Sequence, residues 1–260
     1  MKNTTPLQTL LALTLLAMTL LTSSLTPTDV RADVRPKVRT ENISQTFSNA
    51  FSGELHLRLL TEARRLGAPM KAVHRALNEA RSETYTNRNV IGLFDLSQTS
   101  NKKRFYLLDL QHGTVSAYHC AHGRGNGGNL RATRFRGFQA GNSDMTPLGA
   151  LRTAGDVERH EHYEVVQDRY NSTTYRDLVI LDLEGVKSYN QRFNRHDLWV
   201  ILHANWYVTG GYRRSFSGLL GRSKGCLVLD PKYSNQVFHR LAGGALIYIT
   251  VGDHPIENYL

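Results

Sequence analysis

A series of short apolar runs between residues 90 and 251 limits the folds open to this 260-residue chain. The first three runs are rich in Ile, Val, Leu, Phe and Tyr, and turn-forming segments separate them; they are Val90–Asp95, Arg104–Leu110 and Thr114–Ala121. This pattern predicts an antiparallel meander of strands. Later runs predict further strands at Asp177–Leu183, Leu198–His203, Cys226–Asp230 and Ala245–Val251. The chain is therefore expected to be mainly β.

Helices are predicted before the strands and between the last two of them. Apolar residues recur at helical spacing over Phe51–Leu66 and Pro69–Glu83, which Gly67-Ala68-Pro69 interrupts. Pro231–Leu241 begins with proline and ends before two glycines, as a helix does. We expect an α+β protein, with a helical extension at residues 51–85 packing on a β-rich domain at residues 86–254.

The first 50 residues have the pattern of an export signal followed by a polar leader. A basic start is followed by an apolar stretch at residues 7–21, and Val30-Arg31-Ala32 has the small and aliphatic residues that a signal peptidase reads. The sequence predicts a signal peptide at residues 1–32 and a polar leader at residues 33–50. An uncleaved membrane anchor is the alternative, although the stretch is shorter than the roughly 20 residues of a spanning helix. No later segment is apolar enough to span a membrane.

The chain has a formal net charge of +10 at neutral pH, and its basic residues do not gather in one tail or helix. An exported protein rarely meets nucleic acid, so no nucleic-acid partner is expected. A positive field instead suits an anionic surface such as an envelope polymer. Nothing in the sequence specifies the oligomeric state.

Cysteine and histidine residues point to nucleophilic chemistry. Cys226 follows Ser223-Lys224-Gly225, and His203 ends a predicted strand. A thiol is an effective nucleophile only as thiolate, which a nearby imidazole can generate. Backbone N–H groups of Gly225 and Cys226 could then stabilise the oxyanion of an attacked carbonyl.

Two other interpretations of the cysteines remain open. In an oxidising compartment Cys120 and Cys226 could form a disulfide, which would make this a non-catalytic envelope-binding module. A metal-dependent hydrolase would need a ligand set such as His119, Cys120, His122 and Cys226. The pair His160 and His162 lacks a third ligand at suitable spacing, so no metal is expected there.

Three motifs resemble those of the YkuD-type L,D-transpeptidase catalytic domain: Thr146-Pro147-Leu148-Gly149, the strand ending in His203, and Gly221-Arg222-Ser223-Lys224-Gly225-Cys226. The similarity is greatest to the branch in which a segment like Ala121-His122-Gly123 precedes a glycine-rich loop. It extends from about Val90 to Val251. The resemblance implies a small β-sandwich or barrel-like domain that needs no cofactor.

The resemblance also implies an enzyme of the bacterial cell wall. Such enzymes form a thioester with a peptidoglycan stem peptide and release its terminal D-residue. They then transfer the stem to an amine, as an L,D-transpeptidase, or to water, as an L,D-carboxypeptidase. On this basis Cys226 is the expected nucleophile, His203 the base and Gly225 part of the turn before the thiol. The Ala204 carbonyl or the Ser223 hydroxyl is expected to orient the imidazole.

Four residues are expected to contact substrate. His122 resembles a position that lines the cleft, Trp206 is expected to wall the substrate groove, and Arg222 suits a stem carboxylate. Lys224 replaces the histidine that many members have, where it could stabilise the thiolate or extend into solvent. The segment Thr209–Leu220, rich in Gly, Ser and Arg, is a candidate lid over this site.

Overall fold

The protein is described by a computed structural model that covers residues 53–136, 144–190 and 200–259. The predicted signal peptide and leader lie outside the described residues. So do residues 51–52 of the first predicted helix and residues 198–199 of one predicted strand.

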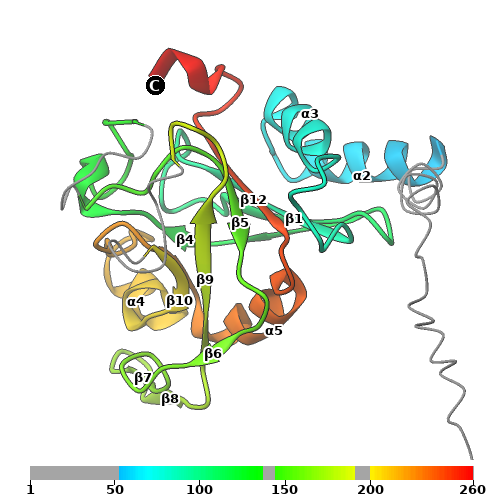
Figure 1. Cartoon of the computed structure of the whole chain (residues 1–260). Coiled ribbons are helices and arrows are strands. Elements are labelled where there is room, and N and C mark those ends of the chain that lie inside the picture. The colour runs from blue at the N-terminus through cyan, green and yellow to red at the C-terminus, as the bar shows by residue number, and fades with distance from the viewer. Residues whose placement is uncertain (1–52, 137–143, 191–199, 260) are drawn as a thin grey trace, which may run out of the picture. The chain divides into compact units, whose positions relative to one another are not determined.

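A single large sheet organises the described residues (Figure 1). Its neighbouring strands follow the order β3-β2-β1-β12-β5-β9-β10-β11-β4, and β6 also pairs with β9. The bounds are β1 Val90–Asp95, β2 Phe105–Asp109, β3 Thr114–Tyr118, β4 Cys120–Ala121, β5 Gly149–Thr153, β6 Glu158–Arg159, β9 Val179–Gly185, β10 Ile201–Ala204, β11 Leu227–Leu229 and β12 Leu246–Thr250. A separate hairpin joins β7, Val166–Asp168, to β8, Thr173–Tyr175.

The sheet nearly closes on itself. Strands β3 and β4 are the two ends of the strand order, yet only His119 separates them along the chain. The two edges of the sheet therefore meet at this point, which gives the barrel-like form expected from the sequence. Most neighbours are antiparallel, but β1 with β12 and β10 with β11 are parallel.

The predicted meander is confirmed, since β1 pairs with β2 and β2 with β3, both antiparallel. The run Thr114–Ala121 is not one strand, because the chain turns at His119 from one edge of the sheet to the other. Strands β5 to β8 were not predicted. Strands β6, β7 and β8 have three residues or fewer, which is too short for an alternation of apolar and polar residues to be detected.

One core fills the inner face of the sheet. Alternate residues of each strand contribute to it, for example Phe105 and Leu107 of β2 and Ile247 and Ile249 of β12. Helix α5, Pro231–Leu241, matches its predicted bounds and adds Val237, Phe238 and Leu241 to the same core. Asp230 caps this helix by accepting a hydrogen bond from the Lys232 N–H.

Helices α2, Gly53–Arg65, and α3, Met70–Glu79, cover one outer face of the sheet. Leu59 of α2 and Val73 of α3 share a buried cluster with Ile91, Leu93 and Tyr106 of β1 and β2. The helical extension therefore packs on the β-rich domain, as expected. No helix among the described residues has the length and apolar character to cross a membrane.

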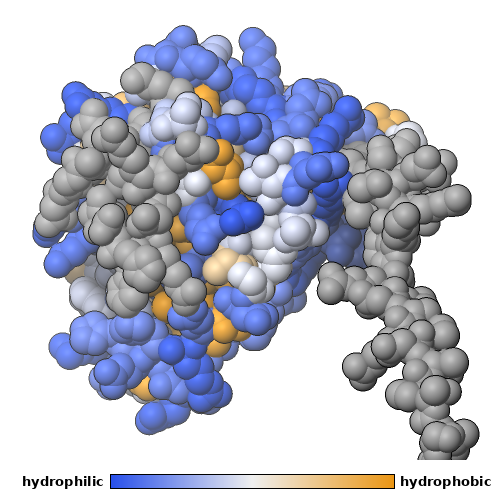
Figure 2. Space-filling view, viewed as in Figure 1, coloured by the Kyte–Doolittle hydropathy of each residue, from blue (hydrophilic) through white to orange (hydrophobic). Residues whose placement is uncertain are grey.

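The other outer face lies over β4, β9, β10 and β11. Its buried cluster comprises Ala121, Ile180, Ile201, Val208, Leu220, Cys226 and Val228. A segment after β10 covers it, including η2, Trp206–Val208, and α4, Gly210–Ser215. The candidate lid thus contains a capped helix, since Thr209 accepts a hydrogen bond from the Tyr212 N–H. On the side seen in Figure 2 the described residues are mostly hydrophilic, and hydrophobic ones form small separate groups.

Candidate active site

His203 and Cys226 lie on the same outer face of two adjacent strands. Strands β10 and β11 run parallel with Leu202 opposite Leu227 and His203 opposite Val228, so Cys226 is level with Ile201. Side chains alternate along a strand, and Ile201 and Val228 share one buried cluster with Cys226. His203, two residues after Ile201, faces the same way. The sheet therefore brings together the two residues that the sequence proposed as a pair.

The His203 ring is fixed by the carbonyl that follows it. Its Nδ1 lies 3.0 Å from the Ala204 oxygen, which can only accept, so Nδ1 carries the proton and Nε2 has the lone pair. The side chain is buried, and this burial lowers its pKa to about 4. His203 is therefore a neutral imidazole at pH 7, in the tautomer that a base requires.

The Cys226 thiol is also neutral in the resting site. Burial raises its pKa to about 11, while hydrogen bonds with the backbone of Ile201 and of Cys226 itself act in the opposite direction. A neutral thiol next to a neutral imidazole is poised for proton transfer during attack rather than before it.

The turn before Cys226 is held by the Ser223 side chain. Its Oγ donates to the Cys226 carbonyl at 2.6 Å and accepts from the Gly225 N–H at 3.1 Å. Ser223 therefore fixes the turn, and of the two candidates only Ala204 has a contact with the imidazole. The Gly225 N–H, expected to bind an oxyanion, is already paired with Ser223. Gly225 has a φ of +114°, a conformation that side-chain-bearing residues rarely adopt.

A buried threonine links this turn to the glycine-rich loop. Thr146 Oγ1 donates to the Gly225 carbonyl at 3.0 Å and accepts from the Gly123 N–H at 2.8 Å. The Asn126 side chain in turn accepts from the Thr146 N–H at 2.7 Å. Because Thr146 and Asn126 are fully buried, these bonds are shielded from competing water. In the sequence Thr146 is recognisable only as part of the Thr146-Pro147-Leu148-Gly149 motif, which predicts no role for its side chain.

His122 lies inside the protein rather than at the cleft surface where it was expected. Its ring is fully buried, and Nδ1 accepts from Arg104 Nη2 at 2.7 Å. Arg104 is also fully buried and donates to the carbonyls of Cys120 and Gln98. Burial, and then the Arg104 charge, lowers the pKa of His122 to about 3. The His122 carbonyl accepts a hydrogen bond from the Ser223 N–H at 3.0 Å. The buried His122–Arg104 pair is therefore linked to the turn that precedes Cys226.

Tyr163 is a neighbour of the pair that sequence reasoning missed. Its ring centroid is 4.4 Å from that of His203, and it packs on the cluster that contains Cys226. Burial, followed by the proximity of Cys226, raises the pKa of its phenol. Tyr163 belongs to a polar turn after His160-Glu161-His162, and no periodicity there indicates that its ring reaches the site.

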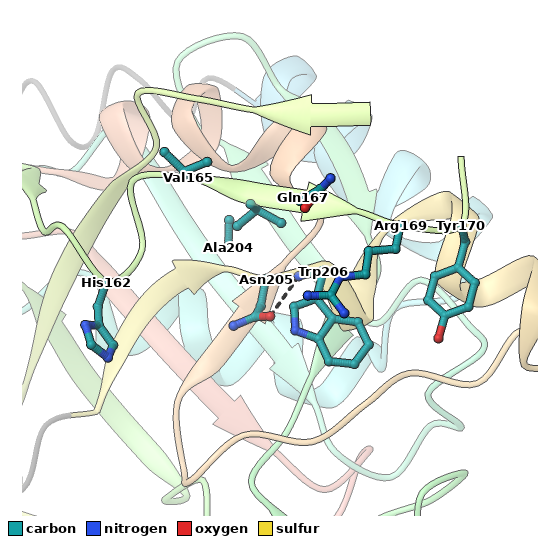
Figure 3. A pocket seen from close by; sticks show the side chains of 9 residues that line it. His162, Val165, Gln167, Arg169, Tyr170, Ala204, Asn205 and Trp206 are labelled. Atoms are coloured by element: carbon teal, nitrogen blue, oxygen red, sulfur yellow. Dashed lines mark hydrogen bonds between the residues drawn. The ribbon is translucent and has the colours of Figure 1, made fainter. Parts of the chain in front are cut away.

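The remaining expected substrate-binding residues are at the surface. Lys224 and Arg222 are exposed, and Arg222 Nη1 donates to the Gly127 carbonyl at 2.8 Å. Trp206 is 46% exposed and lines a pocket beside Ala204 and Asn205 (Figure 3).

Cys120 and Cys226 do not form the disulfide that the non-catalytic alternative requires. Cys120 pairs with Leu229 and faces the inner core, whereas Cys226 lies in the outer cluster. The two sulfurs are thus on opposite faces of the sheet, which also separates the ligands of the zinc alternative. Among the residues that the structure describes, no three His, Cys, Asp or Glu side chains gather in a way that could hold a metal ion.

The chain belongs to the L,D-transpeptidase catalytic domain family, whose model matches residues 66–250. This match begins directly after α2 and ends with β12, so it contains the whole main sheet and the His203–Cys226 pair. A comparison with curated proteins gives no match.

Several solved structures overlap part of the chain. L,D-transpeptidase 1 of Mycobacterium tuberculosis is 18% identical with a TM-score of 0.30, and the overlap covers 62% of this chain and 61% of that one. Bd1075 of Bdellovibrio bacteriovorus is 15% identical with a TM-score of 0.37, covering 66% and 50%. An L,D-transpeptidase of Mycobacterium smegmatis is 16% identical with a TM-score of 0.31, covering 63% and 59%. The chain thus spans less than two thirds of each of these proteins, and family membership rests on the sequence match alone.

Proposed function

We propose that this chain is an exported cysteine acyltransferase that acts on peptidoglycan stem peptides, with Cys226 as nucleophile and His203 as base. The observation that carries the proposal is the common face of β10 and β11 that His203 and Cys226 share. Membership of the L,D-transpeptidase family supports peptidoglycan as the substrate class and the cell envelope as the location.

The reaction follows from the neutral state of both groups. His203 Nε2 takes the thiol proton as Cys226 Sγ attacks the carbonyl that precedes the terminal D-residue of the stem. The imidazolium then gives this proton to the departing amine, and the stem remains as a thioester. The Ala204 carbonyl stabilises the imidazolium through Nδ1–H, and the bonds around Ser223 hold the sulfur in place.

An amine or a water molecule completes the cycle. Attack by an amine of a second stem gives a cross-link, which is the L,D-transpeptidase reaction. Attack by water gives a shortened stem, which is the L,D-carboxypeptidase reaction. Both share one acyl-enzyme, so the acceptor that reaches the thioester decides between them.

Mass spectrometry of the protein after incubation with isolated tetrapeptide stems tests the proposal. An adduct on Cys226 is expected together with release of the terminal D-residue, and the products identify cross-linked dimers or shortened stems. The Cys226→Ser variant should lose the adduct and turnover while keeping its circular dichroism spectrum. Cys120→Ala is the matched control, because that thiol faces the inner core, and it should still acylate. Turnover by Cys226→Ser would exclude the mechanism.

A further inference from the structure

A cavity of about 450 Å³ lies between strand β7 and the turn that joins β10 to η2. Figure 3 shows Gln167 on β7, with Arg169 extending beside the Trp206 indole and Asn205 on the facing turn. The cavity is lined by His162, Val165, Val166, Gln167, Arg169, Tyr170, Ala204, Asn205 and Trp206.

This pocket begins next to the candidate base. The His162 ring at its edge lies 6.3 Å from the Tyr163 ring, and Tyr163 lies 4.4 Å from the His203 ring. Ala204, whose carbonyl holds His203, is also in the wall. A ligand in the pocket would therefore be adjacent to the His203–Cys226 pair while occupying space outside it.

Exposed aromatic rings extend the pocket along the surface. Trp206, Tyr170 and Phe216 are between 43% and 46% exposed, although large aromatic side chains are usually more buried than this. Tyr212 joins them, with ring centroids 5.4 Å from Trp206 and 5.7 Å from Tyr170, and it stacks on Phe216 at 4.3 Å. We call these four residues the aromatic ridge. Trp206 comes from η2, Tyr212 from α4, Phe216 from the residue after α4 and Tyr170 from the turn between β7 and β8. Their mutual ring contacts make the ridge a preformed surface.

The polar groups of the pocket select among ligands. Two side-chain amides, Gln167 and Asn205, and the Arg169 guanidinium supply donors and acceptors, and no carboxylate is among the lining residues. A stem peptide with its acceptor ammonium group would have no anionic partner here. A sugar ring instead offers hydroxyl and acetamido groups to the amides and guanidinium, and its C–H face packs on aromatic rings.

We propose that the pocket and the aromatic ridge bind the carbohydrate chain of the substrate polymer, an N-acetylated amino-sugar glycan. This inference rests on the proposed function for the identity of the polymer. It assigns the stem peptide to the His203–Cys226 pair and the glycan to the neighbouring surface. Binding the chain there would raise the local concentration of stems at the thiol.

Binding of stem-free glycan strands, prepared by removing the peptides from peptidoglycan, tests this assignment by isothermal titration calorimetry on the mature protein. Trp206→Ala and Arg169→Ala should each weaken binding by about tenfold, as loss of one stacking or charged contact does. Tyr233→Ala and Arg176→Ala are the matched controls, because both residues are exposed and lie outside this pocket. They should bind glycan as the wild type does.

Equal glycan affinity of the wild type and of both pocket variants would overturn the proposal. So would displacement of the glycan by isolated tetrapeptide, because it would assign the pocket to the stem. Trp206 and Arg169 are at the surface, and circular dichroism checks that each variant is folded. Glycan binding requires no chemistry at Cys226, so absence of the acyl adduct would remove the proposed function and leave this result intact.

Discussion

The two outer faces of the main sheet differ in what covers them. Over β1, β2 and β12, helices α2 and α3 cover the face, and Leu59 and Val73 pack against Tyr106 of β2 in one buried cluster. Over β10 and β11, a comparable apolar cluster includes the thiol of Cys226, and His203 lies in the same layer. The first face therefore holds none of the residues proposed for catalysis, while the second buries two titratable groups that the apolar surroundings keep neutral.

This difference shows how the fold can support reactivity. The inner core is shared, since Leu202 of β10 and Leu227 of β11 lie in the same buried cluster as Phe105 and Leu107 of β2. Around the His203–Cys226 pair, hydrogen bonds that involve Ser223, Thr146 and the Ala204 carbonyl offset part of the cost of burying polar groups. Substitutions on the two faces should accordingly separate activity from stability.

The largest expected effect is the loss of the base. His203→Ala removes the proton acceptor, and general acid–base catalysis contributes about 10²–10⁴-fold to rates. The acylation rate with tetrapeptide, measured per folded molecule, should fall by that factor, and circular dichroism checks that the variant is folded. His239→Ala removes an exposed histidine from α5 and serves as control. Acylation at the wild-type rate would show that His203 has no part in the proton transfer.

The reverse effect is expected on the helix-covered face. Leu59→Ala empties part of the apolar layer under α2, where Leu59 is only 1% exposed, and such truncations cost about 2–5 kcal/mol. Denaturant unfolding should detect this loss, with the acylation rate per folded molecule unchanged. Leu57→Ala on the same helix is the control, since that side chain is 66% exposed. Equal stability of the two variants would contradict the packing of α2.

The sequence predicted the site pair but not what holds it. His203 and Cys226 lie at the ends of apolar runs that the sequence predicts as strands, so their positions in the sheet could be inferred. The role of Thr146 depends on a contact with Gly225 across 79 positions of the chain. No local pattern reports such a contact, because it exists only after the sheet has closed.

The same reason explains why the burial of His122 was not expected from the sequence. Charged and polar residues ordinarily lie at the surface, yet His122 and its partner Arg104 are both fully buried. Arg104 satisfies its donors with backbone carbonyls and with His122, and only the meeting of the sheet edges supplies these acceptors. The main strands were predictable because their signal is local, unlike β7 and β8, which are short and largely polar.

Acid should destabilise the protein through the buried histidines. An unfolded histidine has a pKa near 6.5, whereas burial lowers the pKa of His203 to about 4 and of His122 to about 3. Between these values the unfolded chain binds more protons than the folded one, so stability falls as the pH decreases. From pH 7 to pH 5 the free energy of unfolding should drop by on the order of 1–2 kcal/mol per histidine.

Denaturant titrations at the two pH values measure this drop. His203→Gln removes one of the groups, so its stability should depend less on pH than that of the wild type. An identical pH dependence in both proteins would mean that His203 is not held neutral by the fold.

The smallest expected effect comes from a comparison of two buried threonines with the same bonding, one beside the turn before Cys226 and one away from it. Thr146→Val leaves the Gly123 N–H and the Gly225 carbonyl unpaired, which costs about 1–3 kcal/mol. Thr153 likewise bridges an N–H and a carbonyl, those of Ala245 and Leu241, but away from the turn before Cys226. Thr153→Val should lose similar stability and keep its acylation rate.

Thr146→Val should also acylate about tenfold more slowly, because a displaced nucleophile attacks less often, and Thr146→Ser should restore the rate. Equal rates for the two valine variants would show that Thr146 supports the fold without positioning the thiol.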